Sequence, residues 1–377
     1  MTQHPRMTAK DFAPELLELY DFYAHGMITK REFLDRAGKF AVGGLTAAAI
    51  LGMMSPDYAM AEQVSFNDPD IRAEWITYPS PNGHGEMRAY YVRPTGVETG
   101  PGVVVVHENR GLNPYIRDVA RRLAKAGFIA MAPDGLTPLG GYPGNDEKGR
   151  ELQRQVDGEK LMNDFFAAIE YLMAQDEVTG KVGITGFCYG GGVSNAAAVA
   201  YPELGAAVPF YGRQPAAEDV PKIEAPILLH YGALDERVNA GWPAYKEALD
   251  ANGKTYEAHI YEGANHGFHN DSTPRYDEDA AELAWTRTLD WFRQIPGLTR
   301  RATRPPAARP REARNPGGGS VTKTTPPASW PGPPRWRRHR PAMQRNMNDH
   351  ARRSTRERAA GHVSPRLGLA LGRSVRW

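Results

Sequence analysis

The sequence predicts an α/β protein with a mostly parallel, doubly wound sheet flanked by helices. Residues 68–298 alternate short strand-like runs with helical patterns of a dozen or more residues, and connections of that length join parallel strands. The run GVVVV (102–106) is continuously apolar, as expected of a strand buried on both faces. The chain is 41% hydrophobic and 10% aromatic, which is enough for a substantial core.

The alternation opens with an antiparallel hairpin, because AEWITYPS (73–80) and MRAYYVRP (87–94) flank the turn sequence PNGHG. A helix is expected over 113–127, with Asn113 as N-cap, Pro114 in the first turn and Gly127 as the stop. The other expected strands are FIAMAPD (128–134), KVGITGF (181–187), AAVPFYG (206–212), APILLHYGALD (225–235) and TYEAHIYEG (255–263). The other expected helices are LMNDFFAAIEYLMA (161–174), GGVSNAAAVAY (191–201), one before residue 255, and DEDAAELAWTRTLDWFRQ (277–294).

Residues 1–61 form an N-terminal extension that reads as an export signal. A helical pattern (13–26) precedes Lys30-Arg31-Glu32-Phe33-Leu34, an uncharged run (40–55) and the small-residue pattern AMA (59–61). The basic pair resembles the twin-arginine motif, with Lys30 where the first arginine is usual. This predicts an exported or periplasmic protein with the export machinery as a partner. The alternative is a cytoplasmic protein whose N-terminal helical hairpin packs on the main domain.

Residues 299–377 are predicted to be a disordered Arg/Pro-rich tail. From residue 300 the tail carries nineteen basic and three acidic residues, a net charge of +16, so the first 299 residues carry −14 of the chain's net +2. With eleven prolines and little apolar periodicity, the tail cannot bury enough surface to fold alone. Nucleic-acid binding through such a tail is the alternative, but we expect none. No run reaches the eighteen apolar residues of a membrane span, so no stable membrane insertion is expected.

The stretch GITGFCYGGGVSN (183–195) holds the only cysteine of the chain, which excludes a disulfide framework and a multi-cysteine metal site. Gly186, Cys188 and Gly190 form Gly-x-Cys-x-Gly between a strand and a helix. This is the nucleophile-elbow pattern of the α/β-hydrolase fold with cysteine in place of serine. The following helix favours the thiolate, and the N–H of Tyr189 would be an oxyanion donor. The alternative is a small buried cysteine.

In that fold an acid and then a histidine follow the nucleophile, each after a later strand. Asp235 and His266 stand in those positions and are the predicted orienter and base. Glu236 and His269 are their neighbouring competitors, and His230, inside an apolar strand, is expected to be a core histidine.

Glu108 ends an apolar strand near the predicted thiol. It would share the thiol proton, and Asn109 would supply the second oxyanion N–H. His107, His266, His269 and Glu108 could in principle ligate a metal, but they match no recognised ligand spacing, so no metal is expected.

Thiolate leaves a tetrahedral adduct more readily than alkoxide. A cysteine nucleophile is therefore productive when the departing oxygen is itself stabilised, as in an enol ester, aryl ester or strained lactone. The acyl-enzyme would be a thioester, which water activated by His266 can open. The sequence therefore predicts a small-molecule lactone or activated-ester hydrolase.

Four stretches resemble the dienelactone hydrolase (carboxymethylenebutenolidase) family, and in particular a subgroup with an export-like N-terminal extension. They are HENRGLNPYIRDVARRLAKAGFIAMAPD (107–134), KVGITGFCYGGG (181–192), LLHYGALDERV (228–238) and EGANHGFHND (262–271). The resemblance covers residues 10–298. It implies a Cys188–His266–Asp235 triad, Glu108 as the thiol's partner, Asn109 and Tyr189 as oxyanion donors, and no metal or organic cofactor.

This sequence departs from the family pattern at two places. Asn109-Arg110 follows Glu108 where apolar residues are typical, and Asn270 stands where an arginine usually holds the substrate carboxylate. The candidate substrate-binding residues are Arg110, Arg150, Tyr211 and Phe268. A non-catalytic ligand-binding protein on a hydrolase scaffold, and a related thioesterase or carboxylesterase, remain alternatives.

Overall fold

The computed structural model describes residues 7–41 and 44–294. Their centre is an eight-stranded sheet with the strand order β1-β2-β4-β3-β5-β6-β7-β8. β1 and β2 pair antiparallel, as do β2 and β4, and the other neighbours are parallel. The strands are β1 Ile71–Ser80, β2 Gly85–Pro94, β3 Gly102–Val106, β4 Ile129–Pro133, β5 Gly183–Phe187, β6 Ala206–Phe210, β7 Ile227–Gly232 and β8 Tyr256–Tyr261. The predicted mostly parallel α/β fold is confirmed.

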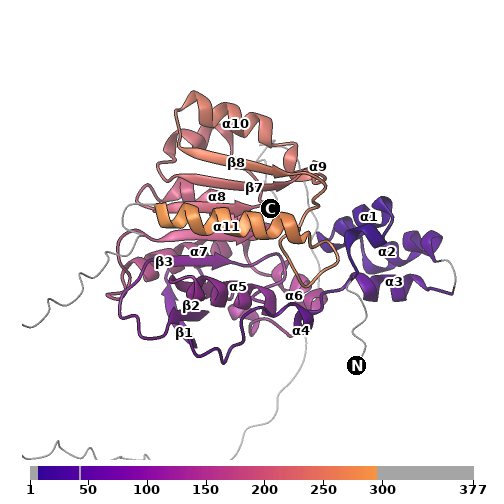
Figure 1. The fold of residues 1–377 in the computed structure, drawn as a ribbon, viewed down its shortest axis with the longest axis horizontal. Coiled ribbons are helices and arrows are strands. Elements are labelled where there is room, and N and C mark those ends of the chain that lie inside the picture. The colour runs from indigo at the N-terminus through magenta and orange to yellow at the C-terminus, as the bar shows by residue number, and fades with distance from the viewer. Residues whose placement is uncertain (1–6, 42–43, 295–377) are drawn as a thin grey trace, which may run out of the picture. The chain divides into compact units, whose positions relative to one another are not determined.

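Helices cover both faces of the sheet (Figure 1). Because successive strand residues point to opposite faces, Val103 and Val105 of β3 join one buried cluster while Val104 and Val106 join the other. The first cluster includes residues of α5 and α11, and the second includes residues of α7, α8 and α10. The catalytic-domain helices are α5 Pro114–Lys125, α6 Asp146–Gln153, α7 Gly158–Met173, α8 Tyr189–Ala200, α9 Glu236–Asn239, α10 Trp242–Ala251 and α11 Glu278–Gln294.

Helix α5 has the ends that its sequence predicts. The Asn113 side chain accepts a hydrogen bond from the N–H of Ile116 at 3.1 Å, so it caps the helix as expected. Pro114 occupies the first position, where the missing N–H costs nothing. Gly127 follows the last turn at φ 99°, a left-handed conformation that glycine adopts readily.

The N-terminal helical unit, defined here as residues 7–61, has a small core of its own. It contains α1 Pro14–Ala24, α2 Lys30–Ala37, α3 Ala47–Met54 and α4 Tyr58–Ala61. Its buried side chains include Leu16, Tyr20, Phe33, Ile50 and Met54. The apolar run predicted as the export signal's core contributes α3 to this cluster.

Polar contacts join the unit to the rest of the protein. Lys30 pairs with Glu147 at 2.7 Å, and Arg275 pairs with Asp21 at 2.9 Å.

The compact unit that contains the sheet runs from Met1 to Thr303, and the second unit is Arg304–Trp377. The prediction of a disordered tail over 299–377 falls outside the described residues. In the part of the chain that the structure covers, no helix combines the length and apolar character needed to cross a membrane.

Candidate active site

Cys188 occupies a strained turn between β5 and α8. Its backbone has φ 56° and ψ −110°, an uncommon conformation for a residue with a side chain. Its N–H donates to the carbonyl oxygen of Phe210 at 3.1 Å. A Cβ on Gly186 would lie 2.2 Å from the carbonyl oxygen of Gly190, and a Cβ on Gly190 would lie 2.3 Å from that of Val106. Only glycine therefore fits on either side of this turn.

His266 and Asp235 form a tight pair. Nδ1 of His266 lies 2.5 Å from Oδ2 of Asp235, and both side chains are buried. A carboxylate only accepts hydrogen bonds, so Nδ1 carries the hydrogen and Nε2 is available to the thiol. A ring nitrogen of His266 and Sγ of Cys188 lie within 4.8 Å of each other. Asp235 also caps α9 by accepting from the N–H of Val238 at 3.2 Å, which fixes the carboxylate.

A second imidazole, which sequence reasoning missed, reaches the same sulfur. His25 follows α1 in the N-terminal helical unit, and its Nε2 lies 3.3 Å from Sγ of Cys188. The same nitrogen lies 3.2 Å from Nε2 of His266. Nδ1 of His25 lies 2.8 Å from the carbonyl oxygen of Asp21 and 3.2 Å from its carboxylate. These acceptors place the hydrogen on Nδ1, so His25 also offers Nε2 to the thiol.

Two guanidinium groups surround this second imidazole. Arg275 donates to Oδ1 of Asp21 at 2.9 Å, and Nε of Arg237 lies 3.7 Å from Oδ2 of Asp21. Nη2 of Arg237 also lies 3.1 Å from Nε2 of His25. A guanidinium only donates, so this contact opposes protonation of Nε2, whereas Cys188 and Asp21 outweigh burial and raise the pKa of His25.

The charges at the site favour a thiolate. Burial opposes ionisation of Cys188, but the charges of His25 and His266 and hydrogen bonds from both hold the pKa of the thiol well below its ordinary value. Burial also works against a charged His266, but Asp235, Cys188 and their hydrogen bonds raise the pKa of this ring to about 10. The pKa of Asp235 is lowered because the charge of His266 and its hydrogen bond outweigh burial. These shifts favour a thiolate at Cys188 and a protonated ring at His266.

Glu108 and Asn109 also lie near the thiol. Burial raises the pKa of the Glu108 carboxyl, the charge of Arg110 opposes that rise, and the charge of Cys188 adds to it. Oε2 of Glu108 accepts from Nδ2 of Asn270 at 3.0 Å, so the residue that replaces the family's arginine binds the predicted partner of the thiol. Nδ2 of Asn109 donates to the carbonyl oxygen of Ala24 at 3.0 Å, next to His25. Tyr189 is the first residue of α8. The oxyanion roles of Asn109 and Tyr189 stay predictions.

The four candidate substrate-binding residues have structural partners here. Arg110 is buried and pairs with Asp146 at 3.0 Å. Arg150 lies over the ring of Tyr23, with 4.3 Å from its guanidinium carbon to the ring centroid, and donates to the Tyr23 carbonyl oxygen.

The other two candidates are aromatic. Tyr211 is buried with its ring 4.9 Å from that of His266, so it supports the imidazole. Phe268 is fully buried in the core, where Tyr211 and Tyr261 pack against it. The substrate-binding roles of these residues stay predictions.

The remaining histidines are engaged elsewhere. The buried ring of His230 contacts the hydroxyls of Tyr261 and Thr288 at 3.0 and 3.1 Å, as expected of a core histidine. His269 contacts the Tyr115 hydroxyl at 2.7 Å, and His107 contacts the backbone of Glu108 and Gly135. In the described part of the chain, the group with metal-ligand spacing is His25, Cys188 and His266. The guanidinium of Arg237 beside His25 opposes a cation there.

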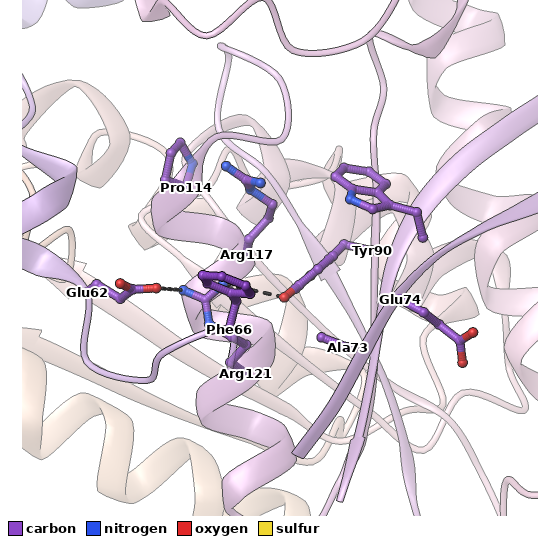
Figure 2. Close-up of a pocket in the computed structure, with 9 residues that line it drawn as sticks. Glu62, Phe66, Ala73, Glu74, Tyr90, Pro114, Arg117 and Arg121 are labelled. Atoms are coloured by element: carbon purple, nitrogen blue, oxygen red, sulfur yellow. Dashed lines mark hydrogen bonds and ion pairs between the residues drawn. The ribbon is translucent and has the colours of Figure 1, made fainter. Parts of the chain in front are cut away.

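Two pockets lie away from the group formed by Cys188, His266 and Asp235. Figure 2 shows one of about 330 Å³, where Arg121 bridges Glu62 at 3.0 Å and the Tyr90 hydroxyl at 3.5 Å. The other, of about 510 Å³, lies between α1–α3 and the α6 region, and Arg110 and Arg150 line it. Neither is lined by Cys188, His266 or Asp235.

The missed residues are Asp21, His25, Arg237 and Arg275. Their signal in the sequence is weak, because His25 and Cys188 are separated by 163 positions. Asp21 and His25 do stand four positions apart, which aligns two side chains on one face of a helix. That spacing is the one feature that could have singled out His25.

Comparison with known proteins supports the fold and places the chain in a family. A family model described as "Dienelactone hydrolase family" matches residues 87–296, and a second model, "YqhI-like", matches residues 4–41. A protein of Escherichia coli K12 described as "Putative hydrolase fragment YghX" is 68% identical over 114 residues, which are 30% of this chain and 97% of that protein. A "Putative carboxymethylenebutenolidase" of Saccharolobus solfataricus is 32% identical over 56% of this chain and 95% of its own.

Two solved structures extend the comparison. The "Putative Dienelactone Hydrolase" of Klebsiella pneumoniae has a TM-score of 0.53 at 29% identity and covers 59% of this chain and 100% of its own. A dienelactone hydrolase-like promiscuous phosphotriesterase from metagenomic libraries has a TM-score of 0.52 at 26% identity, covering 60% and 99%. The fold and its relatives define an ester- and lactone-hydrolase of the α/β-hydrolase fold. The chain belongs to the dienelactone hydrolase family.

Proposed function

We propose that this protein hydrolyses lactones or activated enol and aryl esters with Cys188 as the nucleophile and a thioester as the acyl-enzyme. The observation that carries the proposal is the chain of contacts from Asp235 through His266 to Cys188 at the strained turn. The depressed pKa of the thiol supports a thiolate ready to attack. Family membership supports the ester and lactone class of substrate.

In the first half-reaction an electron pair of the thiolate sulfur forms a bond to the carbonyl carbon, and the π electrons of the carbonyl group move to its oxygen. The N–H groups of Asn109 and Tyr189 are the proposed donors to that oxyanion, and removing one such donor typically costs about 3–4 kcal/mol of transition-state stabilisation. Collapse breaks the bond to the leaving oxygen, which takes the proton from His266. In the second half-reaction water gives a proton to an imidazole as its oxygen bonds to the thioester carbon. The C–S bond then breaks, and its electron pair returns to sulfur.

The test uses Cys188→Ala and His266→Ala in the full chain, with p-nitrophenyl acetate and a carboxylated enol-lactone as substrates. We expect Cys188→Ala to abolish turnover and His266→Ala to lower kcat by ~100-fold or more. Intact mass during turnover of the wild type should show an acyl group on Cys188. A Cys188→Ala variant that retains its activity on both substrates would reject the cysteine mechanism. Ligand binding without turnover in the wild type would favour a binding protein instead.

A further inference from the structure

We propose that His25 is a second catalytic histidine, supplied by the N-terminal helical unit, that deprotonates the water that hydrolyses the thioester. This inference rests on the proposed cysteine mechanism and adds a residue outside the segment that the dienelactone hydrolase model matches. His25 lies instead in residues 4–41, the segment with a family model of its own. A segment other than the hydrolase domain therefore brings a base to the reacting atom.

The geometry of His25 repeats that of His266 around the same sulfur. Each ring has Nδ1 beside an aspartate, Asp21 or Asp235. Each ring also has a nitrogen near Cys188: Nε2 of His25 lies 3.3 Å from Sγ, and a ring nitrogen of His266 lies within 4.8 Å. A side chain that only covered the sulfur would need neither an orienting carboxylate nor a fixed tautomer. The carboxylate of Asp21 is itself held by Arg275.

The proton balance leaves a task for a second base. In the resting site the thiol proton resides on His266. During acylation His266 gives this proton to the leaving oxygen. When the substrate is a lactone, that oxygen stays covalently attached to the acyl chain and remains beside Nε2 of His266. With p-nitrophenyl acetate the leaving p-nitrophenolate departs without a proton, so His266 keeps its proton and cannot act as the base. In both cases Nε2 of His25, which lies within hydrogen-bond distance of the sulfur and of Arg237, is the imidazole nitrogen that can exchange its contact with Arg237 for a water at the thioester carbon.

Formation of the thioester changes the charges around His25 so that they favour the neutral ring. Burial disfavours the charged ring, while the charge of Cys188, its hydrogen bond and that of Asp21 raise the pKa of His25 in the resting site. Thioester formation removes the charge of the sulfur and weakens its hydrogen bond. The charged groups that face the ring are then Asp21, Arg237 and His266 when protonated, and Arg237 favours the neutral imidazole. A neutral ring is what a general base requires.

The contact between the rings of His25 and His266 allows the resting protonation state to be restored. The water proton goes to Nε2 of His25 as the water oxygen bonds to the thioester carbon, and the acid product leaves as the C–S pair returns to sulfur. The two Nε2 atoms lie 3.2 Å apart, so the proton can pass from His25 to His266. This restores the thiolate and imidazolium with no net gain or loss of protons.

The experiment compares the full-length wild type, His25→Gln, Cys188→Ala and the control Glu18→Gln, an exposed change on the same helix. The measurement is pre-steady-state release of p-nitrophenol from p-nitrophenyl acetate, with intact mass to detect acetyl-Cys188. For His25→Gln we expect a burst of one equivalent, accumulation of acetyl-enzyme, and kcat and KM both lowered by ~100-fold. Its kcat/KM, which reports acylation, should fall much less than kcat, because His266 still stabilises the thiolate, and Glu18→Gln should match the wild type.

The outcomes separate the two proposals. Residual turnover by Cys188→Ala would reject the cysteine mechanism itself. An inactive Cys188→Ala together with wild-type kinetics for His25→Gln would reject only the role of His25. Faster turnover by His25→Gln would mean that the ring merely covers the thiol, which also overturns the proposal. If His25→Gln unfolds at a lower temperature than the wild type, Asp21→Asn must reproduce the burst pattern in weaker form, and a uniform loss of kcat/KM would count against a role in deacylation.

Discussion

At the scale of single residues, Cys188 owes its reactivity to two imidazoles and its position to the backbone. Its positive φ directs the side chain out of the turn, while the rings of His25 and His266 supply the charge that stabilises a thiolate. Each ring is oriented by an aspartate that is buried or half-buried. The thiol alone, at an ordinary pKa of about 8.5, would be mostly protonated at neutral pH.

This arrangement predicts how alkylation of Cys188 depends on pH. Because the folded-state pKa of the thiol lies well below its ordinary value, the iodoacetamide reaction rate should be flat between about pH 6 and 8. His266→Ala removes one of the two imidazoles that lower the pKa of the thiol, so the pKa should rise and the rate should begin to climb with pH over the same range. Mass spectrometry of timed aliquots measures both rates. A wild-type rate that increases in proportion to hydroxide concentration would contradict a stabilised thiolate.

His266 predicts the alkaline limit of activity. Its pKa is raised to about 10, so the imidazolium that protonates the leaving oxygen persists up to that pH and is lost above it. We expect kcat/KM for phenyl acetate, whose leaving oxygen needs a proton, to fall as the pH rises through about 10. The Asp235→Asn variant loses the main cause of the raised pKa, so its alkaline limit should move to lower pH. Identical limits in both proteins would refute this assignment.

At the scale of elements, the strand–turn–helix from β5 to α8 depends on glycines that allow backbone segments to touch. In Gly190→Ala the new Cβ would lie 2.3 Å from the Val106 carbonyl oxygen, so we expect a loss of about 3 kcal/mol, the upper end of overpacking costs. Gly192→Ala is the matched control in the same helix, because its Cβ would meet nothing closer than 3.6 Å. That change should stabilise the protein by about 0.5–1 kcal/mol. Urea denaturation measures both, and equal midpoints would contradict the argument.

Elements and their order could be predicted from the sequence because they depend on local patterns. Hydrophobic periodicity and turn residues predicted the eight strands, and Asn113 and Gly127 predicted the ends of α5. The spacing of Cys188, Asp235 and His266 follows the order of the strands, so a one-dimensional pattern reports it. His25 depends on how the N-terminal helical unit docks, which tertiary contacts decide. The pairing of Arg110 with Asp146, on a helix 36 positions away, depends on tertiary contacts in the same way.

At the scale of the whole molecule, two hypotheses about the N-terminal helical unit exclude each other: its cleavage during export and the catalytic role of His25. Export with cleavage after the AMA pattern at 59–61, as the sequence predicts, would remove His25 and α1–α4. The proposed role of His25 requires that they stay. The unit is held by contacts with Arg275, Glu147 and Arg150, and α3 is part of its core.

These contacts predict that the active protein keeps its N-terminus. The exposed pair Lys30–Glu147 contributes about 0–1 kcal/mol, whereas the largely buried pair Arg275–Asp21 both anchors α1 and orients His25. We therefore expect fractionated cells to show esterase activity only where intact mass finds residues 1–61 attached. In Arg275→Met the unit should dock more weakly, and the acyl-enzyme should accumulate as in His25→Gln. Lys30→Met, the control at the exposed pair, should deacylate like the wild type. Full activity in a fraction whose protein begins at Glu62 would instead support cleavage and leave His25 without a role, because the hydrolase domain would then complete the reaction with His266 alone.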